Sequence, residues 1–237
     1  MHLNKLKPVN LFLAAITFCA GLSWGSFTVD PFILRLDISR GQTSGWIELS
    51  PSVNRPVPVE LNVFQRIIDQ DGKENFDSPS SDDLIVYPSE VLLYPGKKVR
   101  VQVSWAKPLA PRTDMSYALV LSEVPLPIQS DKPTDAEIKV QTLARFRAVV
   151  AIETGKPGRL SVVSAQKNDS GKVEIIVENR GEGRIPLDGT YLLIRGKKYR
   201  KFTGSEGNSI MPGEKRRFII ELPYIPTPGE ISYGQGS

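Results

Sequence analysis

Short runs of apolar residues, many alternating with polar ones, fill the sequence from Phe27 to about Ile152, and no helical run of any length interrupts them. Two polar stretches, residues 70–83 and 128–135, separate some of these runs. Roughly seven short strands with a turn signal about every ten residues are typical of an immunoglobulin-like β-sandwich. The runs read FTVDPFILRLDI, GWIELS, PVPVELNVFQRII, LIVYP, EVLLYPGKKVRVQVSW, SYALVLSEVPLP and AEIKVQTLARFRAVVAIE.

The composition of the sequence changes at residues 153–158, which read ETGKPG. Glycine and proline so close together are typical of a linker between domains. Strand-like runs then resume and are separated by the turns NDSG, RGEGR and MPGEK. We therefore expect an all-β chain with two β-sandwich domains, residues 26–152 and residues 153–237.

The first 25 residues have the anatomy of a secretory signal peptide. Lys5 and Lys7 precede an apolar run, and Ser23 and Gly25 place small residues before a cut at Ser26. An uncleaved membrane anchor is the competing reading, but the apolar run is short for a span of about 20 residues. We expect cleavage, export to the periplasm and no stable insertion in the membrane.

Removal of residues 1–25 also removes the only histidine, His2, and the only cysteine, Cys19. Lysine plus arginine falls from 30 to 28 while aspartate plus glutamate stays at 26, so the formal net charge is 28 − 26 = +2. Such a chain has no histidine base or thiol for nucleophilic catalysis, no Cys/His zinc site and no disulfide. We expect no enzymatic activity, no metal and no cofactor.

Two polar features have a simple reading as solvated surface. Asp82 and Asp83 lie in a polar loop, and a pair of adjacent aspartates there is a weak case for a carboxylate hydrolase. The basic segment 195–201 reads RGKKYRK and is typical of an exposed hairpin tip, with an acidic partner or an anionic membrane surface as alternatives. We expect no nucleic-acid partner, because an exported protein rarely meets one.

The stretch 136–153 is the most unusual run, because its alternation predicts a strand of roughly ten or more residues, where five or six are typical. It is either the last strand of the first sandwich or partly an open edge, which proteins usually block with charge, proline or brevity. An open edge invites an extended partner chain, and the guanidinium of Arg147 would suit a carboxylate of that chain. One face carries Ile138, Val140, Thr142, Ala144 and Phe146; the other carries Glu137, Lys139, Gln141, Arg145 and Arg147, with Leu143 as the exception.

Three segments together resemble the periplasmic pilus chaperones of the PapD-like family, which serve the chaperone-usher pathway. Residues 117–127, YALVLSEVPLP, resemble the strand and Glu-Val-Pro exit that precede the long strand of that family. Residues 87–103, YPSEVLLYPGKKVRVQV, resemble its Pro-Gly segment and the strand that follows. Residues 30–38, DPFILRLDI, resemble its first strand. The resemblance covers the first domain well and the second only by size and strand content.

The resemblance implies two immunoglobulin-like domains in an L or boomerang, and a non-enzymatic role in fimbrium biogenesis. Such a chaperone binds pilin subunits by donor-strand complementation, a form of strand addition, and delivers them to an outer-membrane usher for pilus assembly. The resemblance assigns the donated face to Ile138, Val140, Thr142, Ala144 and Phe146, and the subunit's terminal carboxylate to Arg35 and Arg147.

The sequence departs from the family at three points. Arg147 stands where the family generally has lysine, and Ala151-Ile152 stands where many relatives have Arg-Pro, which puts the family's interdomain salt bridge in doubt. Thr142 and Ala144 are smaller than the usual donor residues. These departures indicate a divergent, archaic-type branch.

Two further questions remain open at this point. The alternative function is a structural or adhesive immunoglobulin-like subunit of a surface appendage. Such a subunit needs an apolar N-terminal extension to donate, and only a few residues separate Ser26 from the first strand. The sequence also leaves open whether the free chain caps its edge by forming a dimer.

Overall fold

The computed structural model describes residues 25–75, 82–125, 142–199 and 209–235. Nearly every element in these ranges is a strand, the exceptions being two short 3₁₀ turns, η1 (Ile38–Arg40) and η2 (Pro228–Glu230). No helix in the described ranges is long and apolar enough to cross a membrane. The expected all-β fold is confirmed.

Two sheets that enclose one apolar core make up the larger unit, residues 25–153. The strand order is β1-β3-β9-β7 in the first sheet and β2-β11-β10-β4-β8 in the second. The first sheet contains β1 (Phe27–Asp30), β3 (Ser44–Pro51), β9 (Val99–Trp105) and β7 (Leu84–Tyr87). The second contains β2 (Ile33–Asp37), β11 (Arg145–Glu153), β10 (Met115–Glu123), β4 (Val57–Gln65) and β8 (Glu90–Leu93).

Strand β4 illustrates why these residues form a sandwich. Its sequence, VPVELNVFQ, places Val57, Val59, Leu61 and Val63 on the buried face, whereas the residues between them on the other face are more exposed. This period of two is what a strand with one buried face requires. Strand β10 is different. It lies in the middle of its sheet, between β11 and β4, and both of its faces are buried, so its sequence is mostly apolar.

A second apolar core lies in the smaller unit, residues 160–235. Its sheets have the orders β12-β13-β18, β16-β15-β19 and β14-β17. The strands are β12 (Leu160–Lys167), β13 (Val173–Asn179), β14 (Ile185–Pro186), β15 (Thr190–Ile194), β16 (Lys197–Tyr199), β17 (Ser209–Ile210), β18 (Lys215–Ile220) and β19 (Ile231–Gln235). The domain boundary at residues 152 and 153 stays a prediction.

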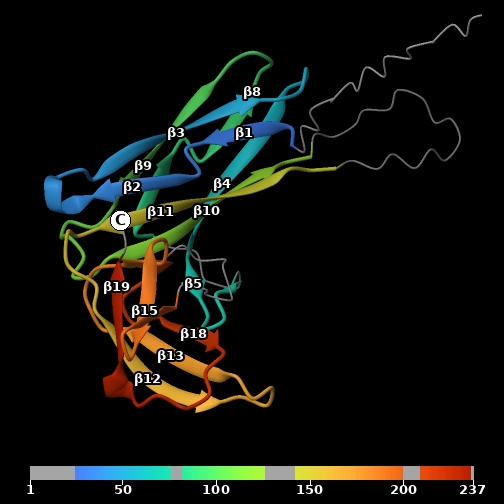
Figure 1. Ribbon diagram of the computed structural model, residues 1–237. Coiled ribbons are helices and arrows are strands. Elements are labelled where there is room, and N and C mark those ends of the chain that lie inside the picture. Colours follow the sequence, from blue (N-terminus) through green and yellow to red (C-terminus); the bar gives the residue numbers. More distant parts are fainter. Residues whose placement is uncertain (1–24, 76–81, 126–141, 200–208, 236–237) are drawn as a thin grey trace, which may run out of the picture.

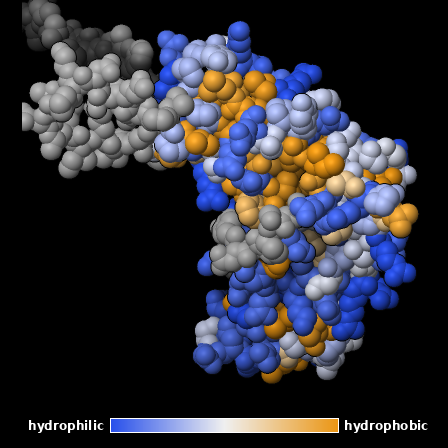
Figure 2. Space-filling model, turned by 180° about the vertical axis from the view of Figure 1, so that it is seen from behind, coloured by the Kyte–Doolittle hydropathy of each residue, from blue (hydrophilic) through white to orange (hydrophobic). Residues whose placement is uncertain are grey.

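Figure 1 shows the two units set at an angle to each other, so that the molecule is bent, with β10 and β11 on the side of the larger unit that faces the smaller one. Figure 2 shows apolar groups gathered on the larger unit, whereas hydrophilic groups cover most of the smaller unit on the same face. The exposed large apolar side chains of the larger unit include Trp46, Ile85, Tyr87 and Leu109.

A small hairpin extends from the end of β4 toward the smaller unit (Figure 1). It pairs β5 (Ile67–Ile68) with β6 (Glu74–Asn75). The Asp69 carboxylate accepts backbone hydrogen bonds from Asp71 and Lys73, both at 2.9 Å, as aspartates at turns commonly do. Residues 70–75 of the expected polar loop are therefore part of an ordered hairpin, and residues 76–81 lie outside the described residues.

Candidate functional site

A cleft of about 230 Å³ lies between the larger and the smaller unit. Arg35 and Arg147, which are predicted to act together, both line it. The larger unit contributes Ile33, Arg35, Arg66, Glu74, Ser116, Arg147, Val149 and Ala151, and the smaller unit contributes Arg184, Ser209 and Met211.

The register of the second sheet explains why these side chains meet. Arg35 pairs with Ala151, and Ala151 pairs with Ser116, so the three lie in one row across β2, β11 and β10. The backbone amide of Arg66 donates to the carbonyl of Ser116 at 3.1 Å, which adds Arg66 to the end of the row. Because side chains alternate across a strand, these four point to the face opposite the core.

Arg147 lies four residues before Ala151 on β11, and therefore on the same face of the strand. Its guanidinium Nη2 lies 3.4 Å from Oε2 of Glu74, a side chain that is only 3% exposed. The Nε of Arg66 lies 3.3 Å from the same oxygen. One buried carboxylate is thus shared by two guanidinium groups.

A second shared carboxylate joins the two units. Oε1 of Glu153 lies 2.7 Å from Nη1 of Arg35 and 3.0 Å from Nε of Arg184. Because Arg184 belongs to the smaller unit, this carboxylate connects the units where the family's interdomain salt bridge was in doubt. The ion pair with Arg184 thus joins Glu153, the last residue of β11, to the opposite wall of the cleft.

The cleft therefore contains more positive than negative charge. Four arginines line it, and the carboxylates of Glu74 and Glu153 form ion pairs with them. The Nε of Arg66 is buried and has an ion pair but no hydrogen bond in the described part of the chain. Such a cleft, with an apolar floor of Ile33 and Val149, suits a carboxylate attached to an apolar chain.

The predicted donated face is only partly described. Ile138 and Val140 lie outside the described residues, and Thr142 is exposed. Ala144 and Phe146 pack against the core of the larger unit, where the ring of Phe146 lies 4.8 Å from that of Phe27. Strand β2 pairs with β11 only from Val149 to Glu153, so the first half of β11 is paired with β10 alone among the strands of the described chain.

Glu123 fixes the point where β11 begins. Its side chain is fully buried and accepts hydrogen bonds from the Ser26 hydroxyl and, at 3.1 Å, from the backbone amide of Ala144. Nη2 of Arg55 lies 2.7 Å from the other carboxylate oxygen. Burial raises the pKa of Glu123, but the hydrogen bonds from Ser26, Ala144 and Arg55 outweigh it and hold the pKa below its usual value.

Sequence reasoning missed several residues of this site. Arg66, Glu74 and Arg184 come from the end of β4, the small hairpin and the smaller unit, and no local motif connects them. Glu123 belongs to the recognised segment SEVPLP, so the sequence did contain a signal for it. The described residues contain no group of three or more His, Cys, Asp or Glu side chains that could hold a metal ion.

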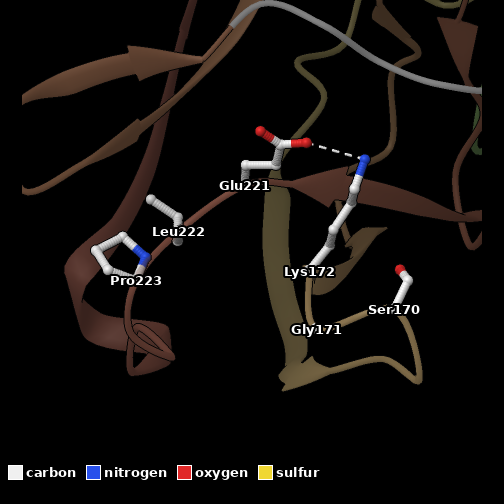
Figure 3. Close-up of a pocket in the computed structure, with 6 residues that line it drawn as sticks. All are labelled: Ser170, Gly171, Lys172, Glu221, Leu222 and Pro223. Carbon is white, nitrogen blue, oxygen red and sulfur yellow. Dashed lines mark ion pairs between the residues drawn. The ribbon is translucent and has the colours of Figure 1, made fainter.

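A larger hollow of about 400 Å³ lies on the smaller unit and is a weaker candidate. Figure 3 shows it bordered by Lys172 and Glu221, whose charged groups lie 3.0 Å apart. Both side chains are well exposed, so they remain hydrated and attract a ligand weakly. The arginine-lined cleft therefore remains the candidate site.

Comparison with known proteins gives similarity in structure alone. No family model and no curated protein matches the sequence. The chain is similar to the class 5 fimbriae chaperone CfaA, with a TM-score of 0.58 and 14% identity over 89% of this chain and 99% of that one. It is also similar to the E. coli chaperone DraB, with a TM-score of 0.57 and 13% identity over 90% and 96% of the two chains.

A third similar structure is the CsuC–CsuE chaperone–tip adhesion subunit pre-assembly complex from the archaic chaperone-usher Csu pili of Acinetobacter baumannii. The matched chain has a TM-score of 0.54 and 16% identity over 84% of this chain and 89% of that one. The chain therefore has the two-domain all-β fold of the chaperone-usher pilus chaperones, the fold that its sequence motifs predict.

Proposed function

We propose that this protein is a periplasmic chaperone of the PapD-like family that binds pilin subunits and delivers them to an outer-membrane usher for pilus assembly. The observation that carries the proposal is the position of Arg35 and Arg147 in one cationic cleft beside β11, on a fold shared with fimbrial chaperones. A signal peptide cleaved before Ser26 would export the chain.

In this proposal the stretch that leads into β11 completes the sandwich of a subunit by donor-strand complementation. The alternating residues Ile138, Val140 and Thr142 face the subunit's groove, and Ala144 and Phe146 continue the same face onto the chaperone's own core. The backbone satisfies the open edges of the groove. Burial of two large apolar side chains, Ile138 and Val140, contributes roughly 3–6 kcal/mol before the cost of association. The packing of Phe146 on Phe27 makes Phe146 the residue at which the donated stretch joins the chaperone's own core.

The cleft sets the register of the bound subunit. Its terminal carboxylate lies between Arg35 and Arg147, whose guanidinium groups form paired, charge-assisted hydrogen bonds with it. Removing one partner of such a buried pair costs about 2–5 kcal/mol, so the loss of Arg147 should release the subunit. This role requires no cofactor and no catalytic group.

The test is co-purification from the periplasm with the subunit encoded beside this gene, for wild type, Arg147→Ala and Arg145→Ala. Arg145 is the matched control, because it is exposed, lies on the same strand and does not line the cleft. A one-to-one complex that forms with wild type and Arg145→Ala but is lost with Arg147→Ala supports the proposal. A well-folded wild type that yields no complex contradicts it and favours a structural or adhesive subunit instead.

A further inference from the structure

The hairpin of β5 and β6 is held by the smaller unit through an arginine that is almost completely buried. The side chain of Arg216 is 1% exposed. Its Nη1 donates to the backbone carbonyl of Asp69 at 2.7 Å, and its Nη2 donates to the carbonyl of Ser209 at 3.2 Å. One side chain of β18 therefore binds the turn of the hairpin and the neighbouring strand β17 together.

Two more contacts hold the same hairpin. The backbone amide of Arg217 donates to the carbonyl of Gln70 at 2.6 Å. The backbone amide of Ile68 donates to Oε1 of Glu214 at 3.3 Å. The β5 side of the hairpin is thus attached to residues at or just before the start of β18.

Arg216 and Glu214 form an ion pair of 3.4 Å at this junction. Burial raises the pKa of Glu214 and lowers the pKa of Arg216, and the attraction between the two groups opposes both changes. A charged pair removed from water in this way is costly unless its hydrogen bonds are made. Because the hairpin makes two of those hydrogen bonds, one with each member of the pair, the pair favours the docked position of the hairpin.

The hairpin also contributes a residue to the cleft. Its strand β6 begins at Glu74, the buried carboxylate that lies 3.3 Å from Arg66 and 3.4 Å from Arg147. A continuous series of contacts therefore leads from β18 of the smaller unit, through the hairpin and Glu74, to the guanidinium of Arg147.

We propose that Glu74 is a positioning residue for Arg147, and that the buried Arg216–Glu214 pair keeps Glu74 in place. The smaller unit thereby completes a carboxylate site whose main residues belong to the larger unit. This inference rests on the proposed function and adds to it the element that orients the cleft.

The charge of Glu74 complicates a test at Glu74 itself. Removal of the Glu74 carboxylate would increase the positive potential around Arg147, which favours the binding of an anion. It would also release the guanidinium of Arg147 from its fixed position, which weakens the binding of an anion. The informative variant is therefore Arg216→Met together with Glu214→Gln. It removes one positive and one negative charge together with the hydrogen bond from Arg216 to the Asp69 carbonyl, so it loosens the hairpin, and it leaves Glu74, Arg66 and Arg147 unchanged.

The probe is a short fluorescein-labelled peptide of alternating valine and serine, made with a free C-terminal carboxylate and with a C-terminal carboxamide. Fluorescence anisotropy gives the ratio of the two dissociation constants. For wild type we expect the carboxylate form to bind about 30-fold more tightly or better, the ratio that corresponds to the lower end of the cost of losing one charged partner. For the double variant we expect the ratio to fall to about 3-fold or less.

A matched control is Lys172→Gln with Glu221→Gln, which removes an exposed ion pair from the same unit and also keeps the net charge (Figure 3). It should retain the wild-type ratio. Because Arg216→Met carries a risk of misfolding, Glu214→Gln alone is the second variant, and far-UV circular dichroism checks that each protein is folded. A merely structural role would change stability without changing the carboxylate-to-carboxamide ratio.

The outcomes separate the two proposals. A folded double variant that keeps the wild-type ratio overturns the positioning role and leaves the proposed function intact. A wild type that does not distinguish carboxylate from carboxamide overturns the carboxylate site, and the positioning role with it. A ratio that falls in the double variant and in Glu214→Gln, but not in the control, supports the inference.

Discussion

Glu123→Ala should lower the free energy of unfolding by about 3–5 kcal/mol. The buried carboxylate accepts hydrogen bonds from the Ser26 hydroxyl and the Ala144 amide, and both donors lose their partner in the variant. Each hydrogen bond to a charged group is worth about 1.5–3 kcal/mol. The pair with Arg55 adds little, because that guanidinium is substantially exposed.

Urea unfolding followed by tryptophan fluorescence measures this effect. Of the three tryptophans, Trp46 and Trp105 lie in the larger unit, so their emission reports on the unit that contains Glu123. The control is Glu48→Ala, which removes a carboxylate that pairs with Lys98 at the surface, and its midpoint should match that of wild type. A loss below about 1 kcal/mol for Glu123→Ala, with an unchanged dependence on urea, would refute the reasoning.

The same carboxylate predicts a dependence on pH. Because the folded protein holds the pKa of Glu123 below its unfolded value of about 4.3, its contribution is complete above that value. The contribution is lost as the pH falls through the lower, folded pKa. The difference in unfolding free energy between wild type and Glu123→Gln should therefore be constant near neutral pH and shrink below about pH 4. A difference that grows on acidification would contradict this assignment.

Three further changes test other parts of the structure. Tyr117→Phe removes the hydrogen bond of 2.8 Å from the buried hydroxyl to Asp83 and should lower the free energy of unfolding in urea by about 1–2 kcal/mol. In wild type, burial and the neighbouring carboxylate raise the pKa of Tyr117, so ultraviolet titration should show its ionisation only when the protein unfolds. Asn179→Ala removes a fully buried amide whose nitrogen donates to two carbonyls and whose oxygen accepts from two amides, so thermal unfolding followed by circular dichroism should show a loss of about 2–4 kcal/mol. Gly183→Ala would place a Cβ 1.8 Å from a backbone oxygen and should lower the melting temperature, whereas Gly229→Ala, where the added atom meets nothing, should not.

Much of the fold could be predicted, because strands with one buried face display that face in the sequence. The alternation in β4 and β13 is complete, and each run was recognisable. The run FTVDPFILRLDI has the pattern of a single strand, but it divides into β1 and β2 in opposite sheets around Pro31. Proline has no backbone amide hydrogen to donate to a sheet, which explains why the strand is interrupted at Pro31. The move to the opposite sheet depends on pairing partners elsewhere in the chain.

The candidate site could be predicted only where it follows a strand. Arg35 and Arg147 stand on the outward faces of their strands, and alternation alone indicates that orientation. The partners of these arginines could not be predicted, because Glu74 and Arg184 reach the cleft through the hairpin and through the smaller unit. Their positions depend on the angle between the two units, which no local pattern encodes.

The parallel pairing of β2 with β11 has a consequence for how the chain folds. Ile33 pairs with Val149, so β2 pairs with a strand that lies roughly half a chain length later in the sequence. Closing so long a loop is slow, since its entropy is lost before the contacts are gained. We expect β2 to be among the last strands to join the sheet during folding, and the edge of β11 to stay open to a competing strand until β2 has paired.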